Sequence, residues 1–568
     1  MPDRRIASRV LERWERVPPW GRTAVALGIL ALAFTLPLRG LLRSQGPPME
    51  EGFMLVFPER VLAGDVPNLD FLHLYGPGSL WVLAAVYKVF GVSLATERVF
   101  GLVQQVGLVL AVFGLARFWG RTAALGCALI SLVIIVPPIG LTALAWTGGV
   151  ALALLGLLAI LHGRRRLEAA NPAALRLATF GGAVAGFSLL YRLDLAVAVG
   201  AAGLAAIWGT SRRFQLRAAV GTALGVAGYV VHLAMAGPGN VVRGMVLEPV
   251  FDLRGGRKLP VPPPWDHLDG FLQRSGAILP PRWPLPHLSS PQQLFVWFFV
   301  LIGAVVLLLA VAAWDVRRDP ARLQARVLLT VAIFSAGMLP QAMQRVDSAH
   351  FAWVSCVPFA FLPIAILELR GARRGARRPM LASLLATGGV LLVMILVIPH
   401  FTAWSYGDYV AQSFGRHRLA FRIERNGRIF YYGRDDVQRA AQALLAKVPE
   451  VANPGDRLLV GTTDLRKTPL SEAYLYYLLP ELTPSTYYIE MDPGVANAED
   501  SRLADDLAGS DVAILSGVWN DWEEPNDSRK VGSDAANRVL KRDFCLVEQF
   551  GQRADGGALY ELWRRCER

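Results

Sequence analysis

Four acidic side chains follow directly after the first long apolar run of this 568-residue chain. They are Glu50, Glu51, Asp65 and Asp70, and Phe, Leu, Tyr and Trp residues surround them. Charged groups beside a bilayer are costly to keep, and those that are kept usually serve chemistry. A carboxylate can take a proton from a hydroxyl group, and fixed cations can stabilise a phosphate that leaves in the same reaction. The segment therefore has the composition of a site that binds an apolar and a polar group together.

Glu50 and Glu51 are neighbours in the sequence. On a helix their side chains point about 100° apart, so they are poorly placed to share a proton. One of them can act as a base while the other orients the acceptor or pairs with an arginine. The competing interpretation is a solvated acid pair in the first turn of an interfacial helix, where the helix dipole favours negative charge. Asp65 lies in Gly64-Asp65-Val66-Pro67, a turn by composition, which predicts a structural role.

Further charged residues lie at the same ends of the apolar runs, mostly arginines with an acid nearby. Guanidinium groups match the geometry of phosphate, and a histidine can donate one more hydrogen bond to it. A local ion pair that anchors a helix end is the alternative for each Arg-x-Asp sequence. The predicted substrate- and phosphate-binding residues are Asp70, His73, Arg98, Arg192, Asp194, Arg345, Asp347 and His350.

The residues that carry these groups are embedded in long apolar runs. Hydrophobic residues make up 53% of the chain, which is typical of polytopic membrane proteins. The net charge is +13, but the arginines lie between apolar runs and not on one basic face, so no nucleic acid partner is expected. About eleven runs approach the roughly 20 residues that a crossing needs. They lie at 23–43, 98–116, 122–138, 142–161, 177–191, 194–208, 216–236, 294–314, 326–343, 351–368 and 380–400.

Arginine-rich connections alternate with connections that carry almost no positive charge. By the positive-inside rule, the arginine-rich ones are predicted to face the cytoplasm. The N-terminal segment 1–22 carries six arginines ahead of a long apolar run and is predicted to be the cytoplasmic start of an uncleaved anchor. Residues 79–90 are short, and counting them as a crossing would turn every later arginine cluster outward. They are therefore predicted to form a re-entrant or juxtamembrane helix.

The predicted transmembrane domain covers 23–400, with outer loops at 44–97 and 237–293. The second loop is rich in Pro and Trp, which predicts a structured loop with little regular secondary structure. Residues 401–568 alternate strand-like and helix-like stretches and are predicted to form a small extracytoplasmic α/β domain. Strands are expected at 457–461, 487–490, 512–516, 545–549 and 558–563, and helices at 471–479, 501–508 and 535–541.

The cysteines are few. Cys545 and Cys566 fall in the predicted outer domain, where an oxidising compartment would allow a disulfide between them; two separate thiols are the alternative. No pattern of Cys, His or acidic residues has the spacing of metal ligands.

The acid pair and the residues after it resemble the first outer loop of the GT-C membrane glycosyltransferases, which include protein O-mannosyltransferases and bacterial aminoarabinose transferases. The shared pieces are Glu50-Glu51-Gly52, the run from Gly64 to Phe71, Gly76-Pro77, and the run that closes at Phe90-Gly91 with Arg98 beyond it. The likeness by motif covers residues 20–200, and beyond them it is one of architecture. The usual pair in the family is Asp-Glu, so Glu50-Glu51 leaves open which acid is the base.

The resemblance implies an inverting transferase that moves a sugar from a polyprenyl-phosphate donor to a glycan, lipid or protein acceptor of the cell envelope. It implies catalysis on the extracytoplasmic side, among membrane lipids and without a metal or other cofactor. The heavy use of Arg over Lys, with abundant Ala and Gly, is typical of a GC-rich bacterial genome, so a bacterial inner membrane is expected. A lipid or solute transporter is one alternative, although transporters place polar groups near the midplane and often have inverted repeats. A non-catalytic envelope scaffold is another.

Overall fold

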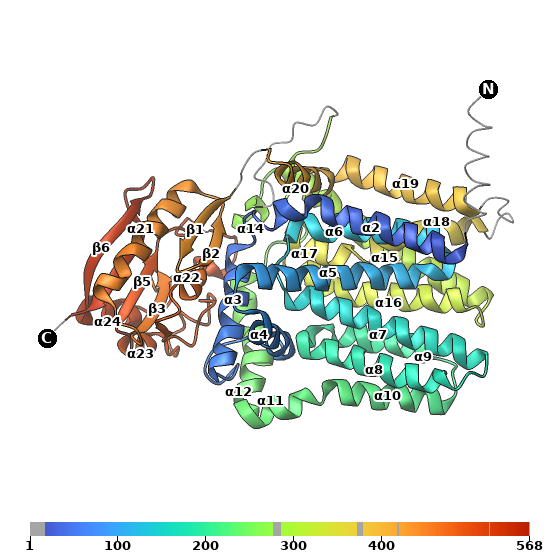
Figure 1. Ribbon diagram of the computed structural model, residues 1–568, viewed down its shortest axis with the longest axis horizontal. Coiled ribbons are helices and arrows are strands. Elements are labelled where there is room, and N and C mark those ends of the chain that lie inside the picture. The colour runs from blue at the N-terminus through green and yellow to red at the C-terminus, as the bar shows by residue number, and fades with distance from the viewer. Residues whose placement is uncertain (1–17, 276–285, 372–378, 417–419, 522, 567–568) are drawn as a thin grey trace.

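The protein has two parts, a bundle of long helices and a smaller domain with a sheet at one end of it (Figure 1). The computed structural model describes residues 18–275, 286–371, 379–416, 420–521 and 523–566. Most of the predicted cytoplasmic segment 1–22 lies outside these residues.

Among the described residues, nine helices are long and apolar enough to cross a membrane. A tenth crossing forms if α17 (Ser348–Ser355) and α18 (Pro358–Gly371), which are bent by 41°, count as one span. The predicted crossing at 194–208 is a shorter apolar helix, η2 (Leu193–Leu195) with α9 (Ala196–Ile207). The chain is thus a polytopic helical membrane protein, as predicted. The nine are α2 (Pro19–Leu41), α5 (Leu94–Ala116) with η1 (Arg117–Trp119), α6 (Arg121–Ile139), α7 (Ala145–Glu168), α8 (Ala173–Tyr191), α10 (Arg212–Val226) with α11 (Gly228–Ala236), α15 (Ser290–Arg318), α16 (Leu323–Gln344) and α19 (Pro379–Val397).

The arginine-rich helix ends meet at the end of the bundle that lies away from the sheet domain (Figure 1). Arg121 at the start of α6 donates a hydrogen bond of 2.8 Å to Thr23 at the start of α2. Arg322, just before α16, pairs at 2.7 Å with Glu368 near the end of α18. The alternation of charge along the sequence therefore predicted which helix ends lie together.

Two short helices, α3 (Pro48–Ala63) and α4 (Gly78–Phe90), lie between the bundle and the sheet domain (Figure 1). α3 begins at Pro48, which suits the first turn because its missing N–H would have no partner there. It ends at Gly64, whose φ of 105° favours glycine. α4 has 13 residues, too few to cross the hydrocarbon core, in line with the prediction for 79–90.

The predicted outer loop 237–293 is more helical than expected. It contains α12 (Pro238–Val242), the π-helix η3 (Arg243–Asp252), α13 (Leu253–Arg257) and α14 (Gly270–Ser275). The prediction of little regular secondary structure was wrong for 238–257 because most of the prolines follow that stretch, at 260–264 and later. Residues 276–285 of this loop lie outside the described part of the chain.

The C-terminal domain is an α/β domain, as predicted. A hairpin of β1 (Phe421–Arg425) and β2 (Arg428–Tyr432) precedes a five-stranded sheet with the order β4-β3-β5-β7-β6. β4, β3 and β5 are parallel, and β7 and β6 are antiparallel additions. β3 and β5 are buried almost throughout, which is typical of parallel strands covered on both faces. The strands are β3 (Arg457–Thr462), β4 (Thr483–Pro484), β5 (Val512–Ser516), β6 (Phe544–Gln552) and β7 (Ala558–Arg565), and the helices are α21 (Asp435–Val451), α22 (Tyr474–Leu478), α23 (Leu503–Ala508) and α24 (Ala535–Asp543).

One predicted strand of the domain is absent from the structure, and the pairing of its two cysteines is settled. Residues 487–490, predicted as a strand, form a loop after the two-residue strand β4. Cys545 in β6 and Cys566 after β7 form a disulfide, so the first of the two alternatives for these cysteines holds. The bond ties the end of the chain to the edge of the sheet.

Helix α3 is held from the side of the C-terminal domain as well as by the bundle. A Cβ atom on Gly52 would lie 2.9 Å from the backbone nitrogen of Tyr474, so only glycine lets α3 and α22 approach this closely. Glu59 of α3 pairs at 2.6 Å with Arg428 of β2. The helix that carries Glu50 and Glu51 is therefore fixed by both parts of the protein.

Candidate functional site

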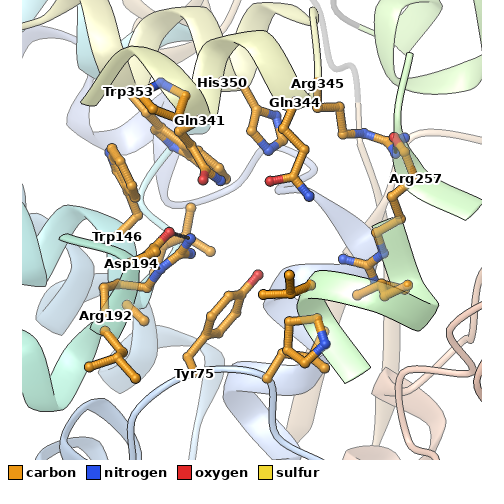
Figure 2. A pocket seen from close by; sticks show the side chains of 18 of the residues that line it. Tyr75, Trp146, Arg192, Asp194, Arg257, Gln341, Gln344, Arg345, His350 and Trp353 are labelled. Atoms are coloured by element: carbon orange, nitrogen blue, oxygen red, sulfur yellow. Dashed lines mark hydrogen bonds and ion pairs between the residues drawn. The ribbon is translucent and has the colours of Figure 1, made fainter. Parts of the chain in front are cut away.

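A cavity of about 650 Å³ lies where the bundle, α3 and the C-terminal domain meet. Figure 2 shows Tyr75, Trp146, Arg192 and His350 around it. Its size suits a small organic ligand. The charged side chains that line it are Glu50, Arg192, Asp194, Arg257, Arg345, His350, Glu490 and Glu524.

Glu50 lines this cavity from the first turn of α3. Burial raises the pKa of its carboxyl above the ordinary value, and the nearby charges of Arg257, His350 and Arg345 act in the opposite direction. A carboxylate with a raised pKa is a stronger proton acceptor, which suits a general base. Of the two rival acids, Glu50 is the one that faces the space where a substrate fits.

Glu51 is fully buried outside the cavity lining. Its two oxygens accept hydrogen bonds from Arg98 at 2.7 and 2.8 Å. Arg98 also donates to the carbonyl oxygens of Leu41 at 3.1 Å and Ser44 at 2.9 Å. This bidentate pair joins α3 to α5 and to the turn after α2. The structure thus places two predicted site residues, Glu51 and Arg98, behind the cavity wall, as expected when adjacent helix residues point in different directions.

Asp65 and Asp70 lie in the turn after α3, away from the cavity lining. Asp65 pairs at 2.7 Å with Arg60, in line with the structural role predicted for it. Asp70, predicted as a substrate-binding residue, accepts a hydrogen bond of 2.7 Å from the backbone N–H of Val66. Arg60 also donates to the carbonyl oxygen of Asp70 at 3.1 Å, so the two acids and the arginine stabilise one turn.

His73, another predicted substrate-binding residue, is fully buried next to the cavity wall. Its ring contacts those of Phe57 and Tyr75 edge to face, with centroid distances of 5.5 and 5.6 Å. Burial lowers its pKa to about 3, so the ring is neutral near pH 7. Tyr75 lines the cavity, and His73 supports it from behind.

Arg192 and Asp194 form the local ion pair that was their alternative interpretation, at 2.6 Å, yet both line the cavity. The guanidinium carbon of Arg192 lies 4.1 Å from the ring centre of Tyr75 and 5.1 Å from that of Trp146. The rings of Trp146 and Trp353 stack, with centroids 5.9 Å apart. Tyr75, Trp146 and Trp353 therefore form an aromatic wall, seen in Figure 2 together with Arg192.

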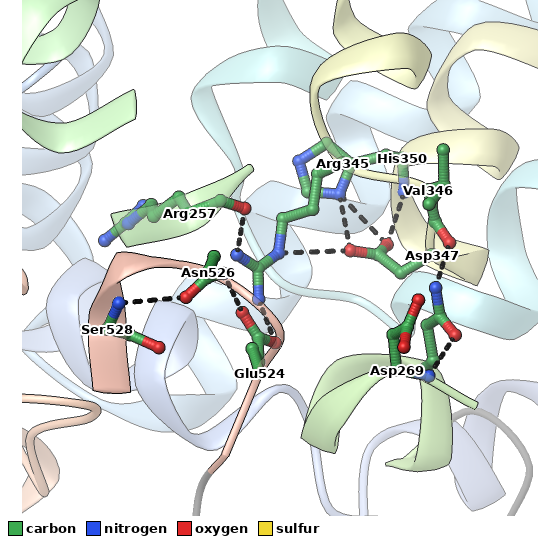
Figure 3. Close-up of polar contacts among 10 residues, drawn as sticks. Arg257, Asp269, Arg345, Val346, Asp347, His350, Glu524, Asn526 and Ser528 are labelled. Atoms are coloured by element: carbon green, nitrogen blue, oxygen red, sulfur yellow. Dashed lines mark hydrogen bonds and ion pairs between the residues drawn. The ribbon is translucent and has the colours of Figure 1, made fainter. Parts of the chain in front are cut away.

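Arg345, Asp347 and His350 belong to one network, shown in Figure 3. Asp347 lies behind the residues that line the cavity, 2.9 Å from Nδ1 of His350 and 3.3 Å from Nε of Arg345. Burial raises the pKa of Asp347, but the charges of His350 and Arg345 and the hydrogen bonds from His350 bring it below its ordinary value. The carboxylate thereby orients the imidazole, and Figure 2 shows this ring at the cavity.

Three charged residues of the cavity were missed in the sequence. Arg257 at the end of α13 pairs with Asp492 and lies 3.5 Å from Glu490. Burial raises the pKa of Glu490 to about 7, while Arg257 lowers it and Glu50 raises it. Glu524 pairs with Arg345 at 2.6 Å. Neither glutamate has a motif around it, and Arg257 lies in a stretch that was predicted to be irregular.

One edge of the cavity is apolar. Val197 of α9 and Val246 and Val250 of η3 line the cavity and are also exposed at the molecular surface. Exposed apolar side chains beside spanning helices are suited to contact with lipid. Within the described residues, no group of three or more His, Cys, Asp or Glu side chains could hold a metal ion.

Comparisons with known proteins show that this chain is similar in fold to solved membrane proteins. No family model and no curated protein matches the sequence. ArnT from Cupriavidus metallidurans bound to undecaprenyl phosphate has a TM-score of 0.51 and 14% identity, covering 95% of this chain and 98% of that one. The Archaeoglobus fulgidus oligosaccharyltransferase tethered with an acceptor peptide has a TM-score of 0.43 and 11% identity, with 95% of this chain and 74% of that one covered. The arabinofuranosyltransferase AftD from Mycobacteria has a TM-score of 0.43 and 14% identity, with 96% and 40% covered. On the likeness to ArnT, which alone of these three has a TM-score above 0.5, the chain has the fold of the GT-C membrane glycosyltransferases.

Proposed function

We propose that the protein is an inverting glycosyltransferase that moves a sugar from a polyprenyl-phosphate donor to an acceptor of the cell envelope. The observation that carries this proposal is the meeting of three features in one cavity: the carboxylate of Glu50, the guanidinium groups of Arg257 and Arg345, and an apolar edge. A polyprenyl-phosphate sugar has three matching parts, which are a reactive sugar, an anionic phosphate and an apolar chain. The ArnT structure, solved with undecaprenyl phosphate, supports the assignment of donor class.

In this reaction Glu50 acts as the base. It takes the proton of the acceptor hydroxyl, the oxygen attacks the anomeric carbon, and the bond from that carbon to the phosphate oxygen breaks with inversion. Arg257 and Arg345 stabilise the negative charge that stays on the phosphate. His350, oriented by Asp347, contributes a further hydrogen bond.

The rest of the cavity accommodates the other parts of the donor. The aromatic wall of Tyr75, Trp146 and Trp353 offers flat apolar faces to a sugar ring. The exposed valines of α9 and η3 offer a path along which the polyprenyl chain leaves toward lipid. The acceptor is a glycan, lipid or protein whose hydroxyl group reaches Glu50 in the cavity.

The two alternatives are less well supported by the site. A transporter is expected to hold its polar residues near the midplane of the membrane. Here the charged residues gather at the end of the bundle next to the C-terminal domain (Figure 1). A scaffold needs no enclosed site, whereas this chain joins Glu50 to Arg345 and Arg192 in one cavity.

The proposal is tested by incubating the purified protein with a panel of radiolabelled polyprenyl-phosphate sugars and envelope extracts. We expect label from one donor to appear in a lipid, glycan or protein fraction. Arg345→Gln should lower the transfer rate about 10²-fold, because a fixed cation at the leaving phosphate is lost. Arg422→Gln is the matched control, since Arg422 is an exposed arginine of β1 and should leave transfer unchanged. Absence of transfer from every donor would contradict the proposal.

We further propose that the cavity and the C-terminal domain lie outside the cytoplasmic membrane of a bacterium, with the N-terminus in the cytoplasm. Positive charge at the opposite end of the bundle supports this orientation. The disulfide between Cys545 and Cys566 supports it too, because disulfides persist in oxidising compartments.

Labelling of single cysteines tests the orientation. Cys127 and Cys356 are first replaced by alanine, and Arg165→Cys and Glu424→Cys, both at exposed positions, are then made separately. A membrane-impermeant maleimide on intact cells should label Glu424→Cys, and it should label Arg165→Cys only after permeabilisation. Equal labelling of both variants from outside would show that the orientation is wrong.

A further inference from the structure

Three buried carboxylates of the C-terminal domain reach the two arginines of the cavity that the proposed function assigns to phosphate. Asp492 pairs with Arg257, and Glu490 lies 3.5 Å from the same guanidinium. Glu524 pairs with Arg345 at 2.6 Å (Figure 3). The side chains of Glu490, Asp492 and Glu524 are only 5%, 0% and 1% exposed. Each arginine therefore already has an anion bound to it.

Arg345 donates hydrogen bonds from both of its Nη atoms, and its Nε is close to a carboxylate without donating a hydrogen bond to any of the described residues. Nη2 donates to Glu524, Nη1 donates to the carbonyl oxygen of Arg257 at 2.9 Å, and Nε lies 3.3 Å from Asp347. A guanidinium binds a phosphate most strongly when two of its N–H groups point at it together. A donor phosphate can gain such a contact only if one of these acceptors, most simply Glu524, moves away.

We propose that Glu490, Asp492 and Glu524 are positioning residues that hold Arg257 and Arg345 when no donor is bound. When a donor binds, these acids release the arginines to its phosphate, so that phosphate binding loosens the loops of the C-terminal domain. This inference rests on the proposed function. The carboxylates keep the arginines in place and neutralised, and the phosphate replaces them as the counter-ion.

The loops that carry these acids both pack on α13, which ends at Arg257. A Cβ atom on Gly256 would lie 2.8 Å from the carbonyl oxygen of Pro493, and one on Gly255 would lie 2.6 Å from Oδ2 of Asp527. Asn526 donates to Glu524 at 3.1 Å and so ties this acid to its own loop. Since α13 continues η3, release of the arginines affects the same segment that forms the apolar edge of the cavity.

The charged groups around Glu490 add a pH dependence to this arrangement. Arg257, Glu50 and Arg192 act on it, Asp492 shares Arg257 with it, and burial raises its pKa to about 7. Below that pH the carboxyl is neutral and holds Arg257 weakly; above it the carboxylate competes with phosphate. Binding of a phosphodiester, whose own charge does not change in this range, should weaken as the pH rises through about 7, and Glu490→Gln should reduce this dependence.

The test measures the Kd of the full-length protein for undecaprenyl phosphate in lipid nanodiscs. We expect Glu524→Gln and Asp492→Asn each to bind about tenfold more tightly than the wild type, because glutamine and asparagine fill the space without competing as anions. Turnover should fall in the same variants, because the arginines lose their positions. In Glu524→Asp, which keeps the carboxylate, the Kd and the turnover should both lie closer to the wild-type values. Glu424→Gln, at an exposed carboxylate of the same domain, is the control. Unchanged or weaker binding by Glu524→Gln and Asp492→Asn would overturn the inference.

A second readout does not depend on substitution. Backbone amides of residues 523–530 in the wild type should exchange hydrogen faster when undecaprenyl phosphate is added, since Glu524 leaves Arg345. Slower or unchanged exchange in spite of binding would overturn the inference and leave the proposed function standing. If the wild type bound no polyprenyl phosphate at all, the proposed function itself would fail.

Discussion

Glu50→Gln is expected to lower the transfer rate by about 10²- to 10⁴-fold, which is the usual contribution of a general base. The glutamine keeps the size of the side chain and its place in the cavity but cannot take a proton. Because Glu50 lines the cavity, whereas its neighbour Glu51 is the acid paired with a buried arginine, the fold should be as stable as that of the wild type. The measurement is kcat with the donor found in the panel assay, beside a thermal unfolding curve of each protein.

Asp70→Asn is the matched control for this variant. Asp70 lies seven residues beyond the end of α3, outside the cavity lining, and its carboxylate accepts a hydrogen bond from Val66, so transfer should change little. Full transfer activity in Glu50→Gln would show that Glu50 is not the base.

The pH dependence of the reaction gives an independent check. A base works only in its deprotonated form, so kcat/KM should rise with pH as Glu50 loses its proton. Burial raises the pKa of Glu50, and this acidic limb should therefore lie above the ordinary value of 4.5. In Glu50→Gln the limb should disappear from whatever activity remains.

Much of the candidate site was visible in the sequence because charge in apolar surroundings is a local signal. Glu50, Arg192, Asp194, Arg345 and His350 stand at the ends of apolar runs, and the structure brings all of them to one cavity. The same signal also selected Glu51 and Arg98, whose charges neutralise each other inside the protein. A sequence pattern shows that a charge is kept near the membrane, but not whether its partner is a ligand or another side chain.

The site residues that the sequence did not predict are brought to the cavity by contacts between residues far apart in the chain. Arg345 and Glu524 are 179 positions apart, and Arg257 and Asp492 are 235 positions apart. Such pairs follow from how the C-terminal domain sits on α3, which no local periodicity reveals. The same holds for the close approach at Gly52, which looks like any other glycine in the sequence.

Secondary structure was predicted best where burial is strong on both faces. β3 and β5 are short continuous apolar runs, and their expected ranges agree with the structure to within one residue. The hairpin of β1 and β2 was not predicted, since arginines and a glutamate interrupt its apolar pattern. Helix α21 was missed although its buried residues recur at the three- and four-residue spacing of an amphipathic helix. The two-residue strand β4 is too short for any periodicity to be visible.

The two adjacent acids have different roles because α3 lies between the cavity and helix α5. Glu50 faces the cavity and is available to a substrate, whereas Glu51 faces α5 and is saturated by Arg98. In this arrangement a base needs a helix that does not move, and the Glu51–Arg98 pair holds that helix. The two variants Glu50→Gln and Glu51→Gln should therefore fail in different ways.

Glu51→Gln is expected to destabilise the protein by about 3–5 kcal/mol, because it leaves the guanidinium of Arg98 buried without its counter-charge. Arg98→Gln should cost about as much by the same argument. The double variant Glu51→Leu/Arg98→Leu should be more stable than either single variant, since it leaves neither charge unpaired. Thermal unfolding in detergent, combined with transfer activity per folded molecule, measures these effects.

The comparison of the two readouts decides which acid is the base. For Glu51→Gln we expect the loss of activity to follow the loss of folded protein, and the molecules that remain folded should keep most of their turnover. For Glu50→Gln we expect normal folding and almost no turnover. If Glu51→Gln were instead as stable as the wild type and inactive, the pairing with Arg98 would be a resting arrangement and Glu51 would be the base.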